Sequence, residues 1–404
     1  MSTTAAAPLS GLRVIDLTRL LPGPAVTMHL ADFGAEVIKV EDTGDGDYLR
    51  GFPPQVATDD GASANPSFVA LNRGKKSLCL NLKDADARDA LLHLVERSDA
   101  LIESFRPGVL ARLGLGWDVL HARNPRLVLC SLSGYGQHGP LAQAAGHDIN
   151  YIALAGVLDQ IRAQGRPAIP NLQLGDVLGG TLSALSTLLI ALLGAQRHGQ
   201  GRWVDVAMTD GLLAHHVFPL AELDAGVAPV AGDTLLTGGV ACYGVYETAD
   251  GRHLAVGALE AKFWQTFCAV IDRPDLASRH WTAGEAPGSA AARDTVETVA
   301  AIIRAQPRAH WEQRFAAVDC CVTPVLTPAE ALAHPQPAAR GIVHRDAGAT
   351  WIGPLAAMRG DGGSHRVGPA RAVAVGAHTR ELLQAAGLGA EAIDALIARG
   401  AARG

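Results

Sequence analysis

The feature that most constrains this chain is an alternation of strand-like and helix-like segments in its N-terminal third. A β-branched run at 12–17 is followed by a Pro-Gly-Pro turn, a helically spaced segment at 26–33 and a second β-branched run at 36–41. Strand, helix and strand within about thirty residues predict parallel pairing through a right-handed crossover. The pattern recurs at 77–82, 84–96, 100–103 and 127–131. We therefore expect an α/β fold with a Rossmann-like, open parallel sheet.

The middle of the chain follows a different pattern. Strand-like segments at 243–246 and 253–256 flank Ala249-Asp250-Gly251, which is typical of a hairpin, and helices are expected at 260–271 and 293–305. We interpret this region as a second, smaller α+β domain. Because no G-x-G-x-x-G follows the first strand, a dinucleotide site of the usual kind is not expected.

Composition and charge exclude several classes of function. The 404 residues carry a formal net charge of -6, which argues against general nucleic-acid binding, because such binding draws its affinity from phosphate neutralisation. No signal peptide is visible before Pro8, and the longest apolar stretch, 182–195, is too short to span a bilayer. Six cysteines without a C-x-x-C pair predict neither a zinc site nor a disulfide framework. We expect a cytoplasmic protein with no metal, no membrane segment and no nucleic-acid partner.

Several short motifs are distributed over almost the whole chain, at 8–17, 30–41, 72–77, 105–108, 133–137 and Gly175-Asp176. In combination they resemble the CaiB/BaiF superfamily, which holds the family III CoA-transferases and the α-methylacyl-CoA racemases. The resemblance implies a large Rossmann-like, CoA-binding domain built from both termini, 1–222 and 338–404, and a small domain with linkers at 223–337. It also implies an interlocked homodimer of two ring-shaped chains.

Asp176 is the first candidate catalytic residue. It lies directly before an expected helix, where a carboxylate is most often a cap. The resemblance gives it another interpretation, because it matches the catalytic aspartate of both branches. That aspartate is the nucleophile in the transferases and one of two proton-transfer groups in the racemases.

Three further acidic and basic side chains join it through the resemblance. A lone histidine on a loop is more often a surface residue than a base, but His147 and Asp148 lie in a string similar to the racemase motif that supplies the second acid/base. Histidine suits that role because its ordinary pKa lies near neutrality. Glu260 taken alone is an ordinary helix-start glutamate, yet it matches the racemase glutamate that orients this histidine.

The phosphates of CoA need cationic donors, and a basic turn supplies them without burying charge. The candidates for this contact are Arg73, Lys75, Lys76, Arg106 and Arg19. A solvated basic turn without a ligand is the alternative. Many relatives carry a basic residue directly after the glutamate matching Glu41, where this chain has Asp42, so the adenosine-phosphate contacts are expected to differ.

The motifs do not decide between the two branches of the superfamily. The segment 235–243 and His147 resemble the racemase pattern, whereas 17–21 and 133–136 resemble the transferase versions. We expect an α-methylacyl-CoA racemase that moves the α-proton of a 2-methylacyl-CoA between His147 and Asp176. Backbone N–H groups beside Asp176 are the expected stabilisers of the enolate. The alternative is a CoA-transferase, acting between an acyl-CoA such as succinyl-CoA and a carboxylic acid through an Asp176 aspartyl-CoA intermediate. Neither reaction needs a cofactor beyond the CoA carried by the substrate.

Overall fold

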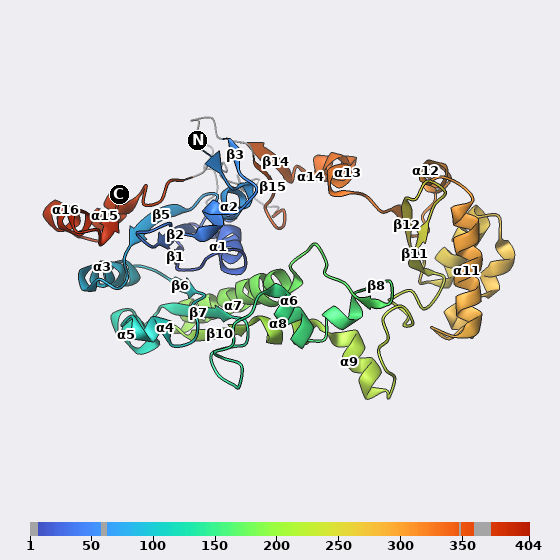
Figure 1. Cartoon of the computed structure of the whole chain (residues 1–404), viewed down its shortest axis with the longest axis horizontal. Helices are drawn as coiled ribbons and strands as arrows, with labels where there is room; N and C mark the ends of the chain where they lie inside the picture. The colour runs from blue at the N-terminus through green and yellow to red at the C-terminus, as the bar shows by residue number, and fades with distance from the viewer. Residues whose placement is uncertain (1–6, 58–62, 347–348, 359–372) are drawn as a thin grey trace. The chain divides into compact units, whose positions relative to one another are not determined.

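The computed structural model describes residues 7–57, 63–346, 349–358 and 373–404, and these form two compact units (Figure 1). The first unit comprises Met1–Ala155, Pro170–His215 and Gln336–Gly404, and the second comprises Gly156–Ile169 and His216–Pro335. This division differs from the expected domain limits in three places. The segments 156–169 and 216–222, the latter with most of the helix α9 (Val217–Asp224), belong to the second unit, and residues 336–337 belong to the first.

The first unit is built on a seven-stranded sheet of order β10-β7-β6-β1-β2-β5-β16. Its strands are β1 (Arg13–Asp16), β2 (Glu36–Glu41), β5 (Lys76–Leu80), β6 (Ala100–Glu103), β7 (Val128–Ser133), β10 (Trp203–Ala207) and β16 (Ala402–Arg403). The strands β10, β7, β6, β1, β2 and β5 pair in parallel, as the alternation predicts. The edge strand β16 is antiparallel to β5, so the expectation of a purely parallel sheet is wrong at this edge.

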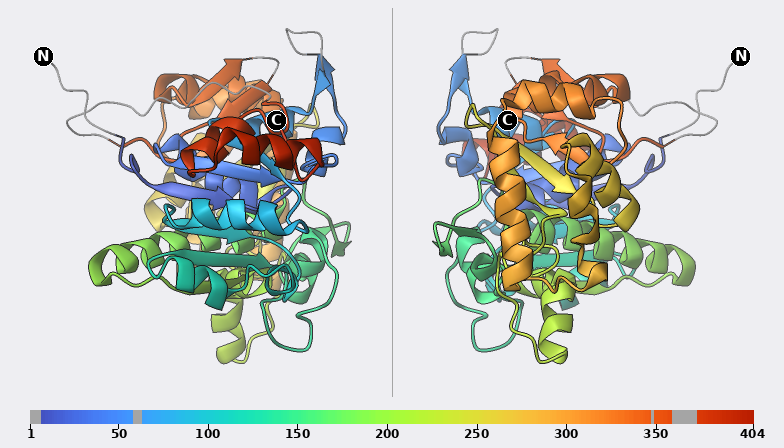
Figure 2. Two further views of the ribbon diagram at one scale, coloured as in Figure 1. Left: turned by 90° about the vertical axis from the view of Figure 1, so that its left-hand side faces the viewer. Right: turned by 90° about the vertical axis from the view of Figure 1, so that its right-hand side faces the viewer.

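Helices cover both faces of this sheet (Figures 1 and 2). One face packs against α3 (Ala85–Val95), α4 (Val109–Arg112), α5 (Trp117–Arg123), α15 (Thr379–Ala385) and α16 (Ala390–Ala398). Alternate strand residues such as Ile38 and Val40 point into that layer, which is the period-two pattern of a strand. The other face packs against α1 (Pro22–Asp32) and α7 (Ser183–His198), with α6 (Asp148–Leu154) and α8 (Met208–His215) beyond.

The helix α7 continues a π-helical segment, η3 (Gly175–Leu182), so Asp176 lies inside the helical run and the expectation that it directly precedes the helix is wrong. Within the described part of the chain, Gly175–His198 is the one helical run of 24 residues long and apolar enough to cross a membrane. The expectation that this region is too short to span is therefore wrong on length. Length and composition are weak support for a span, because a core helix passes the same test. Here the run packs against α1 and α8.

Smaller elements complete the first unit. They are η1 (Tyr48–Gly51), α2 (Pro66–Leu71), and two-stranded sheets formed by β3 (Val56–Ala57) with β4 (Ser63–Ala64) and by β14 (Val343–Asp346) with β15 (Ala349–Ile352). The helix α2 begins at a proline and is capped by Asn65, whose side chain accepts a hydrogen bond from the Phe68 N–H. This helix packs against β15, which joins the C-terminal segment to the N-terminal half of the unit.

The second unit is an α+β body, as the sequence pattern predicts. Its sheet is antiparallel in the order β11 (Tyr243–Glu247), β12 (His253–Gly257) and β13 (Val322–Pro324). Trp264 and Phe267 of α10 (Ala261–Val270) are fully buried and stack at 5.3 Å between ring centroids. The remaining elements are η2 (Leu158–Gln160), β8 (Arg162–Ala163), β9 (Arg166–Pro167), η4 (Pro274–Ser278), η5 (Trp281–Ala283), α11 (Ala290–Arg304), α12 (Arg308–Phe315) and α13 (Pro328–Ala333). The helix α14 (Pro335–Arg340) begins at the boundary between the units.

Candidate active site

A pocket of about 480 Å³ opens at the carboxyl ends of the central strands of the first unit. The chain leaves β1 toward β2 and β5 on one side, and later returns to β6, β7 and β10 on the other. The order of strands therefore reverses between β1 and β6. Open α/β sheets bind their ligands in the crevice at such a reversal.

The pocket is lined by residues that directly follow three strands. After β1 the lining residues are Leu17, Arg19, Leu20 and Pro22. Ser104 to Pro107 follow β6, and Gly134 and Tyr135 follow β7. His147, Tyr151, Asp176 and Met208 complete the wall on the side of α6, η3 and α8. Both proton-transfer candidates thus line the same pocket, although 29 residues (176 minus 147) separate them in the sequence.

Asp176 is the second residue of the π-helical segment η3 and is half-buried. Its backbone N–H donates to Oδ1 of Asp148 at 3.0 Å. Gly175 makes this approach possible, because a Cβ at that position would lie 3.0 Å from the same oxygen. Burial raises the pKa of the Asp176 carboxyl to about 7, and the negative charge of Asp148 adds to the rise. A carboxyl with this pKa is present in both protonation states near neutral pH.

His147 is the exposed residue before α6, and Asn150 shapes its backbone. The Asn150 Oδ1 accepts the His147 N–H at 3.0 Å. Behind it, the Tyr151 hydroxyl donates to the Gly146 carbonyl at 2.5 Å, and its ring meets Tyr135 edge-on at 5.3 Å. Any Cβ at Gly146 would lie 2.7 Å from the Tyr151 ring. The imidazole therefore sits on a loop held by close packing of an aromatic pair.

Glu260 lies in the second unit, where it precedes α10 as its N-cap residue. His147 and Asp176 belong to the first unit. The pairing of Glu260 with His147 therefore stays a prediction.

The expectation that backbone N–H groups beside Asp176 stabilise the enolate is wrong for two of these groups. The Asp176 N–H is engaged by Asp148, and the Val177 N–H donates to the Gln173 carbonyl at 2.8 Å. These two donors at the start of η3 are therefore not free for a substrate oxygen.

Two of the expected phosphate contacts line the pocket. Arg19 forms an ion pair with Asp42 at 2.6 Å, with both side chains about two-fifths exposed. Arg106 is exposed and has no ion-pair partner among the residues that the structure describes. A guanidinium in this state is available to an anion without first breaking a salt bridge.

Two residues of the basic turn, Arg73 and Lys75, differ from the sequence interpretation. Arg73 is buried and binds both carboxylate oxygens of Asp32, at 3.0 and 2.5 Å. Lys75 is also buried, and its ammonium contacts Asp16 at 3.2 Å and the Asn72 side chain at 2.9 Å. Both charges are enclosed, so the expectation of an open basic turn is wrong for these two residues.

Lys76 is the third basic residue of that turn, and it is about one-third exposed. Its ammonium pairs with Glu381 at 2.7 Å and with Glu36 at 3.1 Å. It is not among the residues that line the pocket. The structure therefore brings Arg19 and Arg106 to the site and leaves Lys76 on a salt-bridged surface.

Sequence reasoning missed several pocket residues, notably Tyr48, Phe105 and Met208. Phe105 had a detectable signal, since it directly follows the predicted strand at 100–103 and ligands gather at the carboxyl ends of such strands. Tyr48 and Met208 had none, because they reach the pocket from other elements. Among the described residues, no group of three or more His, Cys, Asp or Glu side chains is arranged to hold a metal ion.

Comparison with known proteins identifies the family of the chain. Residues 9–369 match the model of CoA-transferase family III. The chain is 37% identical to α-methylacyl-CoA racemase from Homo sapiens over 82% of its length and 81% of the relative, and 35% identical to acetyl-CoA:oxalate CoA-transferase from Acetobacter aceti over 86% and 88%. The crystal structure of a CaiB/BaiF family protein from Brucella suis superposes with a TM-score of 0.80 at 25% identity, covering 95% of this chain and all of that one. The chain therefore belongs to the CaiB/BaiF family of acyl-CoA enzymes, CoA-transferase family III.

Proposed function

We propose that this protein is an α-methylacyl-CoA racemase. The observation that carries the proposal is that His147 and Asp176 line one pocket at the strand-order reversal, with the pKa of Asp176 raised to about 7. A proton exchange at one carbon needs one group that accepts a proton and another that donates it. A carboxyl that titrates near neutrality serves either role, whereas a carboxylate nucleophile gains nothing from being protonated.

The proposed reaction places the α-carbon of a 2-methylacyl-CoA between the two groups. One group takes the α-proton, the C–H electron pair moves onto the thioester carbonyl oxygen, and an enolate forms. The other group then delivers a proton to the opposite face, and the carbonyl is restored. Asp148 keeps the Asp176 backbone in place through its 3.0 Å hydrogen bond, and Glu260 would orient His147.

The CoA moiety is proposed to bind along the wall formed by Arg19 and Arg106. Both arginines line the pocket, and arginine forms directed hydrogen bonds to phosphate. No metal or redox group enters the proposed steps, because the thioester itself makes the α-proton acidic. We place this activity in the cytoplasm.

A homodimer is part of the proposal. The helix α7 exposes Ile190 and Leu193, which are 69% and 48% accessible, on the surface of the first unit. Neighbouring apolar side chains on one helix face favour burial against another surface. Analytical ultracentrifugation tests this assembly, and a monomer at micromolar concentration would contradict it.

The alternative is a CoA-transferase in which Asp176 attacks the acyl-CoA carbonyl. The similarity to the oxalate CoA-transferase over most of both chains favours this reading, as does the position of Asp176 in the pocket. In this mechanism a mixed anhydride forms as the CoA thiolate leaves. The thiolate then attacks the Asp176 carbonyl of the anhydride, which gives an aspartyl-CoA thioester and releases the donor acid as its carboxylate. The acceptor carboxylate attacks this thioester and displaces the thiolate, and the thiolate attacks the acceptor carbonyl of the second anhydride, which gives the new acyl-CoA and frees Asp176.

Mass spectrometry of α-proton exchange in D₂O distinguishes the two. The wild-type protein is incubated with 2-methyldecanoyl-CoA and no added carboxylic acid. We expect deuterium at the α-carbon together with inversion of configuration, and we expect the inversion to be lost in Asp176→Asn and in His147→Ala and retained in Asp118→Asn, an exposed aspartate outside the pocket. Inversion that persists in His147→Ala would remove the role given to this residue. An absence of uptake in the wild type, with CoA transfer on adding succinate or oxalate, would establish the transferase.

A further inference from the structure

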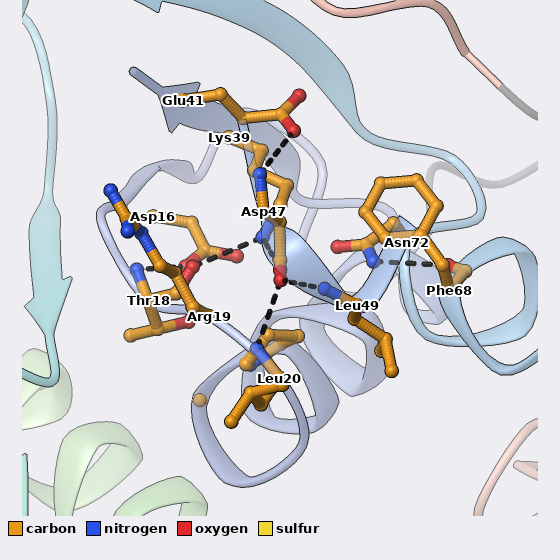
Figure 3. Close-up of polar contacts among 12 residues, drawn as sticks. Asp16, Thr18, Arg19, Leu20, Lys39, Glu41, Asp47, Leu49, Phe68 and Asn72 are labelled. Atoms are coloured by element: carbon orange, nitrogen blue, oxygen red, sulfur yellow. Dashed lines mark hydrogen bonds and ion pairs between the residues drawn. The ribbon is translucent and has the colours of Figure 1, made fainter. Parts of the chain in front are cut away.

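A buried ion pair lies behind one wall of the pocket without lining it. Nζ of Lys39, in β2, lies 2.9 Å from Oδ2 of Asp47, and the two side chains are 2% and 0% exposed (Figure 3). Removing two charges from water is costly, and such a pair is weak support for a purely stabilising role. What the pair contacts is therefore informative.

The pair binds the backbone of the loop that follows β1. The Lys39 ammonium donates to the Thr18 carbonyl at 3.0 Å, and Oδ1 of Asp47 accepts the Leu20 N–H at 3.3 Å (Figure 3). The chain is thus held on both sides of Arg19. Leu20 has a φ of 64°, in the left-handed region that non-glycine residues adopt only when their surroundings impose it.

Asp16 adds a third attachment to the same loop. Its Oδ1 accepts the Thr18 N–H at 2.9 Å and the Thr18 hydroxyl at 2.5 Å. Burial alone would raise the pKa of Asp16, but the charges of Lys75 and Lys39 and the hydrogen bonds from Thr18 and Thr27 together outweigh it and lower the pKa to about 2. The carboxylate therefore stays charged, and the loop is bound to a network of fixed charges.

The same pair also holds a second segment of the pocket wall. Oδ1 of Asp47 accepts the Leu49 N–H at 3.1 Å, next to Tyr48, which lines the pocket. The chain between β2 and Tyr48 makes a second contact with the loop after β1, through the ion pair of Asp42 with Arg19. One buried carboxylate therefore joins the two chain segments that present Arg19 and Tyr48.

We propose that Lys39 and Asp47 are positioning residues for acyl-CoA binding, acting through the loop that carries Arg19 and the segment that carries Tyr48. This inference rests on the proposed function, since it requires the pocket to bind a CoA thioester. Neither residue lines the pocket with His147 and Asp176. Loss of the pair should therefore weaken binding of the substrate and leave the chemical step nearly unchanged.

The test compares two buried aspartates of the first unit. Asp47→Asn keeps an oxygen that can accept the backbone N–H groups but removes the charge facing Lys39. Asp32→Asn is the matched control, because Asp32 pairs with Arg73 at equal burial and does not line the pocket. Two readouts are taken well below the unfolding midpoint, namely the kinetics of 2-methyldecanoyl-CoA exchange and amide hydrogen exchange in peptides covering 17–22.

In Asp47→Asn we expect the KM to rise about tenfold with kcat changed by less than about threefold. We also expect the Leu20 amide to exchange at least about tenfold faster. Asp32→Asn should leave both readouts at wild-type values. An unchanged KM, an unchanged exchange rate in the loop, or a fall in kcat at constant KM would each overturn the proposal.

Two further measurements complete the test. If Asp47→Asn does not fold, the double variant Lys39→Met/Asp47→Asn, which leaves no unpaired buried charge, is measured in the same way. Calorimetric titration of free CoA into the wild type tests the proposed function separately. If wild-type protein neither binds CoA nor exchanges the α-proton, the proposed function fails and the claim about binding falls with it. If CoA binds and only the variant readouts fail, the role of the pair is refuted alone.

Discussion

The carboxylate pair Asp148 and Asp176 makes a quantitative prediction about pH dependence. The pKa of Asp176 rises from an ordinary 3.8 to about 7, with burial as the larger cause and the charge of Asp148 as the smaller. The whole rise is about 3 units, so Asp148, as the smaller cause, contributes less than half of it, or less than about 1.5 units. One unit corresponds to about 1.4 kcal/mol of interaction between the two carboxylates.

The perturbation is Asp148→Asn, which removes the charge and keeps an oxygen to accept the Asp176 N–H. For the substrate enantiomer deprotonated by Asp176, kcat/KM rises with pH through the pKa of this group. We expect the midpoint in the variant to fall below the wild-type value of about 7, by less than about 1.5 units, because the larger part of the rise comes from burial and remains.

The assay is the pH profile of α-deuterium uptake between about pH 5 and 9, measured for each enantiomer separately. Asp118→Asn is the control for a change in overall charge, and its midpoint should stay within about 0.2 units of the wild type. A midpoint in Asp148→Asn that stays at the wild-type value would refute the electrostatic coupling. Loss of activity at every pH would instead assign Asp148 to the proton transfer itself.

Two further predictions concern stability. Because the folded-state pKa of Asp176 lies above its unfolded value, its contribution to stability is present below about pH 4 and is lost as pH rises through about 7. Urea unfolding should therefore show that the free energy of unfolding of Asp176→Asn, relative to the wild type, increases by up to about 4 kcal/mol between pH 4 and pH 8. A difference between the two proteins that does not change with pH would contradict the raised pKa. Gly179→Ala should destabilise the first unit by more than about 3 kcal/mol, because the new Cβ would lie 2.2 Å from the Met208 carbonyl oxygen. Gly194→Ala in α7 is the matched control, with no atom within 4 Å of its Cβ, and should be neutral or stabilising; equal thermal midpoints for the two variants would show that the η3–α8 contact tolerates a methyl group.

The sheet and its helices were largely predictable because their signals are local. The β-branched runs correspond to β1 and β2, and the segment at 84–96 corresponds to α3. The proline-rich segment at 324–337 shows the limit of composition, because it contains the helix α13 despite its prolines. Thr327 accepts the Glu330 N–H, and the Glu330 side chain accepts the Thr327 N–H. That capping box starts a helix with proline at its first position.

The site was predictable only in part. Asp176, His147 and Arg106 were found by motif, and the structure places all three on one pocket. Arg73 and Lys75 were misjudged because basic residues in a glycine turn have the same sequence pattern whether they face water or a buried carboxylate. The carboxylates that enclose them, Asp32 and Asp16, lie 41 and 59 positions away.

By itself the sequence determined the α/β class, the parallel core of the sheet, the second α+β body and the identity of the main catalytic candidates. Each of these follows from residue periodicity or from a short motif. Only the tertiary structure decided the antiparallel edge strand β16, the pocket at the reversal between β1 and β6, and the buried Lys39–Asp47 pair. The physical reason is that strand order, burial and charge pairing depend on contacts between distant segments, and such contacts leave no periodic trace along the chain.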